Sequence, residues 1–369
     1  MSLRSRRPLD TILVGLLIGV CIFGLIVLLS ASGPVAFQAF SDPLYFVRRQ
    51  IFLGLIPGGI LFYVISRFDV NKLKPFAFPA LIATLVLLAS VFIPGLGHRV
   101  GGSTSWIDLR FIRIQPSEFA KVTFIVYAAG WLASRGKNEG KTVEGAMPFF
   151  LAIAAVIILL ALQPDTGSMC VLVMTIMCMY FVAGAPILWF GTLFAGIAGA
   201  IALMIKLTPY RAVRFMTFLH PELDPQGVGY HINQAFLAIG SGGIFGYGYN
   251  QSRQKFLYLP EAQDDSIFAI MAEELGLIVC VLFLLAVSAI VWRCLRIAKR
   301  APDDFQSYLC IGIASWIAVQ AIVNIASMTG LMPMTGVTLP FVSYGNSATV
   351  SLFIGLGLVA AVSRSRRSG

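Results

Sequence analysis

Apolar runs alternate with short polar segments along almost the whole chain. A helix that crosses a membrane needs about 17 to 25 mostly apolar residues, and ten stretches meet that requirement. They are residues 10–32, 46–66, 76–95, 117–134, 147–163, 167–184, 186–206, 266–292, 306–331 and 340–363. The pattern predicts an all-α polytopic membrane protein with ten transmembrane helices.

Composition agrees with this interpretation and excludes a soluble enzyme. The 369 residues are 58% hydrophobic and only 12% charged, whereas about a quarter of the residues in a soluble domain are charged. The apolar run that follows the basic residues 1–7 is long enough to span and lacks a small-residue cleavage site, so we expect a signal anchor rather than a cleaved signal peptide.

The net charge of +10 does not indicate a nucleic-acid partner, because the basic residues cluster in separate connections between the predicted spans. The clusters are Arg4, Arg6 and Arg7; Arg67, Lys72 and Lys74; Arg135, Lys137 and Lys141; Arg293, Arg296, Lys299 and Arg300; and Arg364, Arg366 and Arg367. Cytoplasmic connections are enriched in Lys and Arg. We therefore predict that both termini are cytoplasmic.

This topology places two long segments outside, residues 96–116 and 207–265. The second is the large extracytoplasmic loop, too polar and too rich in Gly and Pro to be another span. Its alternating glycines at 240–248 predict a close backbone approach or a re-entrant path. We interpret residues 1–369 as a single transmembrane domain without an internal repeat, which weakens a transporter built from inverted halves. The six cysteines show no CxxC spacing, so neither disulfides nor a metal site are expected.

Charged residues surround the predicted start of the fourth span. Pro116 is typical of a first helical turn, and Glu118 and Lys121 are three residues apart, so their side chains share one helix face. They either pair with each other or line a polar cavity, and the cavity lining is the favoured interpretation because of the cations upstream. Arg110 and Arg113 lie just upstream, and such a group of cations suits a pyrophosphate or another anionic headgroup.

Asp165 lies in the tight connection between the fifth and sixth spans. It either caps the next helix or faces the same outer cavity. The three histidines, His98, His220 and His231, have no neighbours at zinc-ligand spacing, so no metal role is predicted for them.

Four carboxylates mark the start of the eighth span. Asp264 and Asp265 lie at the junction of loop and helix, and Glu273 and Glu274 follow inside the apolar run. Charged groups at a membrane span are costly to desolvate and usually carry a function. Asp264 or Ser266 alternatively serves as the N-cap of the helix. For the two glutamates a purely structural role is the less favoured interpretation.

Residues 329–347 interrupt the last two spans with prolines and glycines. Non-helical backbone at membrane depth is tolerated where it is buried in protein or lines a cavity. The cluster of Ser343, Tyr344, Asn346 and Ser347 is typical of such a lining, and an outer hairpin is the alternative. The residues alone thus predict an outward-facing polar cavity without specifying a reaction, and they favour a transporter.

Five motifs, in order, resemble the shape, elongation, division and sporulation (SEDS) family, which includes FtsW and RodA. They are IQPSEFAK, QPDTGS, HPELDPQGVGYHINQAFLAIGSGGIFGYG, QKFLYLPEAQDDSIFAIMAEELG and TGLMPMTGVTLPFVSYGNS, and the resemblance extends from about residue 10 to about residue 363. It implies a multi-pass peptidoglycan glycosyltransferase in the bacterial cytoplasmic membrane that polymerises lipid II in cell division or elongation. Its implied partners are a class B penicillin-binding protein and other divisome or elongasome proteins.

The resemblance also implies a site. The essential outer-loop aspartate of the family falls on Asp265, which would act as general base. Glu118 and Lys121 complete the catalytic set, and cations stabilise the undecaprenyl pyrophosphate leaving group. The expected substrate-binding residues are Arg113, Asp165, Arg110, Gln115, Ser343 and Asn346. No metal ligands are expected, and a divalent cation is the one cofactor left open.

The chain departs from the family pattern at several positions. Members often have His-Thr-Asp-Phe at residues 263–266, so Asp264 is an additional carboxylate beside the expected base. Asn346 replaces a glycine and Ser105 replaces an arginine. The run QKFLYLPE and Thr338 favour an FtsW-like over a RodA-like member.

Two other functions stay open at this stage. A lipid II flippase would use the same cavity and cations but would not need a base at Asp265. A non-catalytic scaffold for the divisome would tolerate charge-neutral changes at that position.

Overall fold

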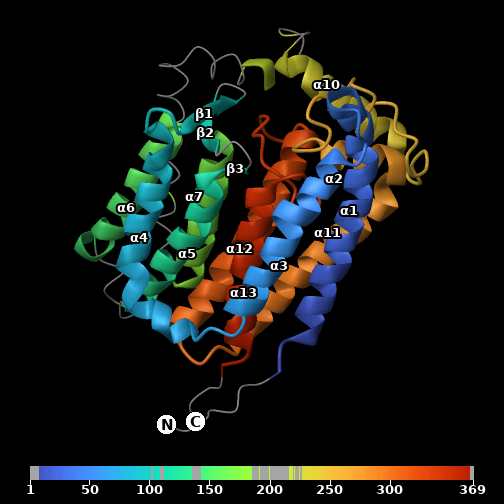
Figure 1. Cartoon of the computed structure of the whole chain (residues 1–369). Helices are drawn as coiled ribbons and strands as arrows, with labels where there is room; N and C mark the ends of the chain where they lie inside the picture. Colours follow the sequence, from blue (N-terminus) through green and yellow to red (C-terminus); the bar gives the residue numbers. More distant parts are fainter. Residues whose placement is uncertain are drawn as a thin grey trace.

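The computed structural model describes residues 8–100, 103–108, 112–134, 143–184 and 227–365, together with residues 191, 199, 216–218, 220 and 224. Arg110 and all of the predicted span 186–206 except residues 191 and 199 lie outside the described residues. The helices stand side by side in an upright bundle with a small sheet at one end (Figure 1).

The described elements are mostly helical. The helices are α1 (Thr11–Phe40), α2 (Tyr45–Arg49), η1 (Gln50–Leu55), α3 (Ile56–Ile65), η2 (Val70–Phe76), α4 (Ala77–Ala89), η3 (Ser90–Phe92), α5 (Pro116–Ser134), α6 (Val143–Leu162), α7 (Thr166–Val182), α10 (Val228–Gly242), α11 (Ile267–Lys299), α12 (Asp304–Met328) and α13 (Asn346–Ser363). Six helical segments of the described chain are long and apolar enough to cross a membrane, and shorter apolar helices occupy Met147–Leu162 and Thr166–Val182. The total of ten spans stays a prediction.

The structure corrects the expected fold in three places. Three short strands, β1 (Gly97–Val100), β2 (Ser103–Asp108) and β3 (Arg113–Ile114), form an antiparallel sheet, so the chain is not purely α-helical. Helix α10 lies within the segment predicted as a loop. The last predicted span begins too early, because Phe341 adopts a positive φ of 68°, which is incompatible with a continuing helix.

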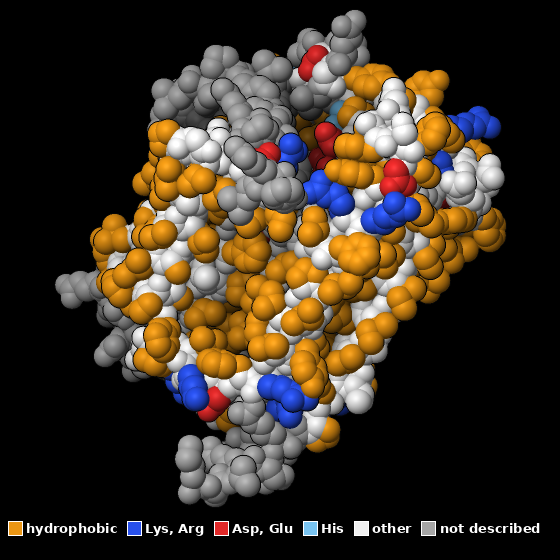
Figure 2. Space-filling view, viewed as in Figure 1, with side chains coloured by type: hydrophobic (Ala, Val, Ile, Leu, Met, Phe, Trp, Pro, Cys, Tyr) orange, Lys and Arg blue, Asp and Glu red, His pale blue; other side chains and the backbone are white. Residues whose placement is uncertain are grey.

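The segments that the sequence predicts to share one side do gather at one end of the bundle. The sheet, α10, the start of α5 and the segment between α12 and α13 lie at the upper end in Figure 1, and the connections that follow α3 and α11 lie at the lower end. Between the two ends the visible surface is mainly apolar, with charged side chains at both ends (Figure 2). This distribution is typical of a bundle surrounded by lipid.

Helix α12 forms the centre of the bundle. It packs against α5, α7, α11 and α13, and Trp316, Gln320 and Asn324 are all fully buried on it. Because these three residues are spaced four apart, they lie along one face of the helix. A buried polar face on the central helix connects elements that are distant in sequence.

Helix α11 is interrupted at Gly276, which has a φ of 73° and a ψ of 179°. The break releases the carbonyl groups of Glu273 and Glu274 from the helical ladder. They accept hydrogen bonds from the amides of Tyr247 (3.0 Å) and Gly248 (2.9 Å) instead. The released backbone groups therefore remain satisfied, as burial requires.

The same glycine-rich segment also accepts hydrogen bonds from α11. The amides of Leu277 and Ile278 donate to the carbonyl groups of Gly243 (3.0 Å) and Ile244 (3.3 Å). The close backbone approach predicted from the alternating glycines is confirmed, and its partner is the break in α11.

Replacing Gly246 by alanine is expected to destabilise the protein by about 2–6 kcal/mol, because strain at positive φ and overpacking each cost about 1–3 kcal/mol. Gly246 has a φ of 74°, and an added Cβ would lie 2.2 Å from the carbonyl oxygen of Glu274. The measurement is the thermal unfolding midpoint of the purified protein in detergent. The control is Gly240→Ala, where an added Cβ meets nothing within 4 Å. Equal midpoints for both variants would contradict the close approach.

Glu274 anchors the loop that follows the glycine-rich segment. Its carboxylate accepts hydrogen bonds from Lys255 Nζ (2.8 Å), Ser30 Oγ (2.7 Å) and the amides of Asn250 (3.1 Å) and Ser252 (3.2 Å). Lys255 and Glu274 are both buried, so the ion pair fixes the loop to α1 and α11.

Glu273 completes this anchor. Its carboxylate accepts from the amides of Arg253 (3.0 Å) and Gln254 (3.3 Å) and from the Ser252 hydroxyl. Both glutamates therefore anchor the loop, and the expectation that they are more than structural stays a prediction.

Candidate active site

The N-terminal turn of α5 is tied to α7 and α13. The amide of Gln115 donates to Ser347 Oγ (3.1 Å), and Ser117 Oγ donates to Asp165 Oδ2 (2.9 Å). Asp165 Oδ1 accepts from the amide of Ser168 (3.0 Å). Asp165 therefore caps α7, as one of the two sequence interpretations proposed, and it also links α7 to α5.

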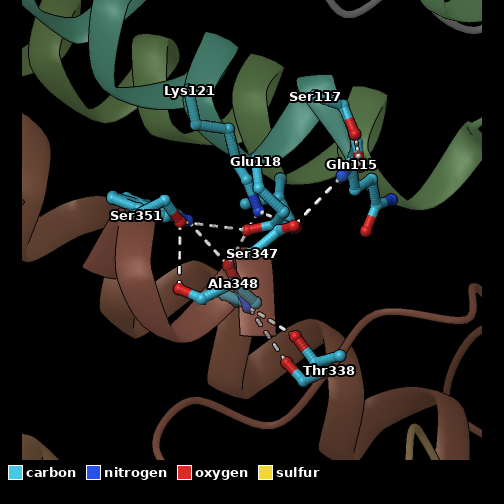
Figure 3. A network of polar contacts seen from close by, with 12 residues as sticks. Gln115, Ser117, Glu118, Lys121, Thr338, Ser347, Ala348 and Ser351 are labelled. Atoms are coloured by element: carbon cyan, nitrogen blue, oxygen red, sulfur yellow. Dashed lines mark hydrogen bonds and ion pairs between the residues drawn. The ribbon is translucent and has the colours of Figure 1, made fainter. Parts of the chain in front are cut away.

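Glu118 and Lys121 form a buried ion pair one turn into α5 (Figure 3). Lys121 Nζ lies 2.7 Å from Glu118 Oε1, and the two residues are only 2% and 5% exposed. Ser351 Oγ donates to the other oxygen of Glu118 (3.4 Å). Of the two sequence interpretations, the structure shows pairing.

The pair leaves little open space beside it. The gap next to Lys121, lined by Leu172, Thr175 and Trp316, has essentially no room for a water molecule. Nearer the upper end of the bundle, acidic and basic side chains surround a hollow in the surface (Figure 2). Glu118 and Lys121 are buried, so the ion pair itself forms no part of this charged surface.

Gln320 connects the ion pair to the segment between α12 and α13. Its Oε1 accepts from Lys121 Nζ (3.1 Å) and from Trp316 Nε1 (2.6 Å). Its Nε2 donates to the carbonyl oxygen and the hydroxyl of Thr338 (both 3.1 Å). Lys121 Nζ also lies over the Trp316 ring, 5.2 Å from its centre. A fully hydrogen-bonded buried amide of this kind holds its neighbours in one arrangement.

The backbone that carries Asp265 is held at three consecutive residues. The carbonyl oxygens of residues 263–265 accept, in order, from the amide of Tyr344 (2.9 Å), Ser343 Oγ (2.6 Å) and Asn324 Nδ2 (2.8 Å). Asn324 lies one turn after the glutamine that binds Lys121. Helix α12 therefore positions both the ion pair and the loop of Asp265.

Asp265 is 8% exposed, and its carboxylate has a hydroxyl beside it. Ser266 Oγ donates to Asp265 Oδ1 (3.5 Å) and lies 2.6 Å from His231 Nε2. The other carboxylate oxygen faces Gly336, where an added Cβ would lie 4.0 Å away. The absence of a side chain at Gly336 leaves room in front of the carboxylate.

Asp264 differs from Asp265 in its electrostatic environment. Burial raises the pKa of the Asp264 carboxyl group well above its usual range, and the carboxylates of Glu261 and Asp265 raise this pKa further. Asp264 therefore keeps its proton to a higher pH than an ordinary aspartate.

The remaining predicted site residues lie in different environments. Arg113 on β3 pairs with Asp108 (3.2 Å) but is 57% exposed, so its guanidinium group is accessible. Ser343 is buried and its hydroxyl holds the loop of Asp265, and its expected contact with substrate stays a prediction. Asn346 Oδ1 is buried and has no hydrogen-bond partner among the described residues. Arg110 lies outside the described residues.

Gln320 and Asn324 were missed at the level of sequence. The sequence does contain a pattern that predicts them: both amides lie in an otherwise apolar span, four and eight residues after Trp316. This spacing places all three side chains on one helix face. In the described part of the chain, no group of three or more His, Cys, Asp or Glu side chains is arranged to hold a metal ion.

Comparison with known proteins covers nearly the whole chain. The family model for FtsW, RodA and SpoVE, described as cell cycle protein, matches residues 10–368. Stage V sporulation protein E of Bacillus subtilis (strain 168) is 40% identical over 368 residues, which is 100% of both chains. The probable peptidoglycan glycosyltransferase FtsW of Trichlorobacter lovleyi is 35% identical, over 96% of this chain and 93% of the relative.

Solved structures share the fold. A chain from a peptidoglycan synthase complex, described as coordinating polymerization and crosslinking, superimposes with a TM-score of 0.78 at 28% identity, covering 98% of this chain and 99% of that one. Rod shape determining protein RodA of Thermus thermophilus superimposes with a TM-score of 0.73 at 27% identity, covering 98% of both chains. The order of the motifs, the arrangement of the helices and these matches lead to one conclusion: the chain belongs to the FtsW/RodA/SpoVE family.

Proposed function

We propose that this protein is a peptidoglycan glycosyltransferase that polymerises lipid II at the outer face of the bacterial cytoplasmic membrane. The observation that carries the proposal is the geometry of Asp265, whose backbone is held at three consecutive residues while its carboxylate faces the open position at Gly336. Membership of the family, with relatives named as probable peptidoglycan glycosyltransferases, supplies the reaction.

In this proposal Asp265 acts as the general base. It accepts the proton from the acceptor sugar hydroxyl while that oxygen attacks the anomeric carbon of the donor, and the bond from that carbon to the pyrophosphate oxygen breaks. Ser266 contacts the carboxylate, and His231 contacts Ser266. They orient Asp265 by hydrogen bonding.

The leaving group is undecaprenyl pyrophosphate, whose negative charge grows as the bond breaks. The exposed guanidinium group of Arg113, together with Arg110, is suited to binding it. We assign Glu118 and Lys121 the positioning of α5 against α12. Gln115 and Asn346 are further candidates for substrate contacts, and Asp165 supports the start of α5.

A divalent cation would have few protein ligands in this arrangement, since the described residues hold no cluster of three suitable side chains. The pyrophosphate oxygens of the substrate would provide most of its ligands, because hard divalent cations are commonly bound through substrate phosphates.

The proposal includes ten spans, cytoplasmic termini and a class B penicillin-binding protein as partner, within the divisome or the elongasome. The six apolar helical segments and the apolar surface between the charged ends support the membrane topology. The partner is proposed because a structural relative comes from a complex that couples polymerization with crosslinking.

The decisive experiment is polymerisation of fluorescent lipid II by the purified full-length protein, with and without its cognate penicillin-binding protein. We expect glycan strands, detected by gel electrophoresis, that disappear when lipid II is omitted. Transfer of lipid II across vesicle membranes without any polymer would favour the flippase instead. If the protein neither polymerised lipid II nor transferred it across membranes with any partner, the non-catalytic scaffold would be the remaining function.

A further inference from the structure

Residues from the start of α1 and from the ends of α11 and α13 line a separate cavity. These helix ends lie at the lower end of the bundle in Figure 1. The cavity has a volume of about 200 Å³, and it is lined by Asp10, Arg293, Arg296, Arg300, Ser363 and Ser365 among others. This volume is roughly the volume that six or seven water molecules occupy in the liquid. The cavity can therefore hold a polyatomic group rather than a single ion.

One of the three arginines has a structural partner. Arg293 forms a two-pronged ion pair with Asp10, with its Nε 3.0 Å from both carboxylate oxygens and one terminal nitrogen 2.7 Å from Oδ2. This pair fixes the end of α11 to the start of α1. Arg296 and Arg300 are exposed and form no ion pair with another residue of the described chain, so two uncompensated cations face the cavity.

The cavity borders the lipid-facing surface. Arg296 stacks on the ring of Trp292, with its guanidinium carbon 4.8 Å from the ring centre, and Trp292 is 54% exposed. Exposed tryptophans are enriched at the level of lipid headgroups. The stacked pair therefore places the Arg296 guanidinium group where a phospholipid phosphate would lie.

The two serines indicate which kind of headgroup fits. Ser363 Oγ donates to the carbonyl of Ala360 (2.7 Å), and Ser365 Oγ donates to that of Ala361 (3.3 Å). Both hydroxyl hydrogens are therefore donated to carbonyl groups of α13, while both oxygens can still accept. They match a ligand that brings hydroxyl donors of its own.

We propose that this cavity binds the headgroup of an anionic phospholipid with free hydroxyl groups, of the phosphatidylglycerol type. Its phosphate binds Arg296 and Arg300, and its glycerol hydroxyls donate to Ser363 and Ser365. Basic pockets between membrane helices are known to hold anionic headgroups. The inference does not depend on the proposed enzymatic activity.

The test is a binding titration of the full-length protein in neutral detergent with dioctanoyl phosphatidylglycerol, dioctanoyl phosphatidylcholine or inorganic phosphate. Binding is read from lipid adducts in native mass spectrometry and from the unfolding midpoint. We expect binding of phosphatidylglycerol alone. The double variant Arg296→Gln/Arg300→Gln should bind it roughly 25-fold more weakly, about fivefold for each arginine.

The matched control is Arg67→Gln/Lys72→Gln, which removes two exposed cations outside the cavity. This control should bind phosphatidylglycerol as tightly as the wild type. An equal loss in both double variants would overturn the site in favour of diffuse surface charge. Equally tight binding of inorganic phosphate would overturn the lipid assignment, and absence of binding by the wild type would overturn the proposal altogether.

Discussion

Asparagine in place of Asp265 is expected to lower the rate of lipid II polymerisation by about 100- to 10,000-fold, the usual contribution of a general base. The amide has the shape of the carboxylate but cannot accept the proton. The hydrogen bond that Asn324 donates goes to the backbone carbonyl of residue 265 (2.8 Å), so the loop should keep its position. Polymerisation of labelled lipid II and the unfolding midpoint are measured on the same preparations.

The adjacent carboxylate provides a matched control. Asp264→Asn makes the same substitution one residue earlier, and we expect this variant to retain most of the activity. The raised pKa of Asp264 makes it the natural rival as a base, so the pair of variants discriminates between the two assignments. An active Asp265→Asn protein beside an inactive Asp264→Asn protein would move the base to Asp264.

The second large effect concerns the two buried ion pairs. Glu118→Gln leaves Lys121 charged without a partner, and Glu274→Gln does the same to Lys255. Each change is expected to destabilise the protein by about 3–5 kcal/mol, because a buried charge loses its compensation. In each case the second substitution, Lys→Met, removes the orphan charge and should recover most of the stability. Unfolding midpoints of the single and double variants check this expectation.

Activity separates the two pairs, although their stability effects are similar. The double variant Glu118→Gln/Lys121→Met should stay inactive, because Lys121 is tied through Gln320 to the segment between α12 and α13, which also holds the loop of Asp265. The double variant Glu274→Gln/Lys255→Met should regain activity, since that pair only anchors a loop. Equal recovery of activity in both would show that the pair on α5 has a structural role alone.

Much of the helical architecture could be predicted from the sequence. The length of an apolar run is a local property, and in a membrane it alone decides where a helix is stable. Helices accordingly occupy the predicted spans within the described residues. The spacing of Glu118 and Lys121 on one helix turn and the close approach of the glycines around residue 246 are likewise local signals, and both are confirmed.

The sequence by itself also identified the residues with chemical potential, because carboxylates in an apolar chain are conspicuous. It did not determine their partners. Lys121 and Gln320 are 199 positions apart, and Lys255 and Ser30 are 225 positions apart, so only the packing of distant helices brings them together. For the same reason the anchoring role of Glu273 and Glu274 was not foreseen.

Tertiary structure alone decided three further features: the break in α11, the small sheet and the buried polar face of α12. A helix break at Gly276 is stable only where another backbone satisfies the released groups, and that backbone is the segment 243–248. The sequence thus determines the lengths of the apolar runs and the spacing of residues along each helix. The hydrogen-bond partner of a buried polar group depends instead on which helices lie side by side.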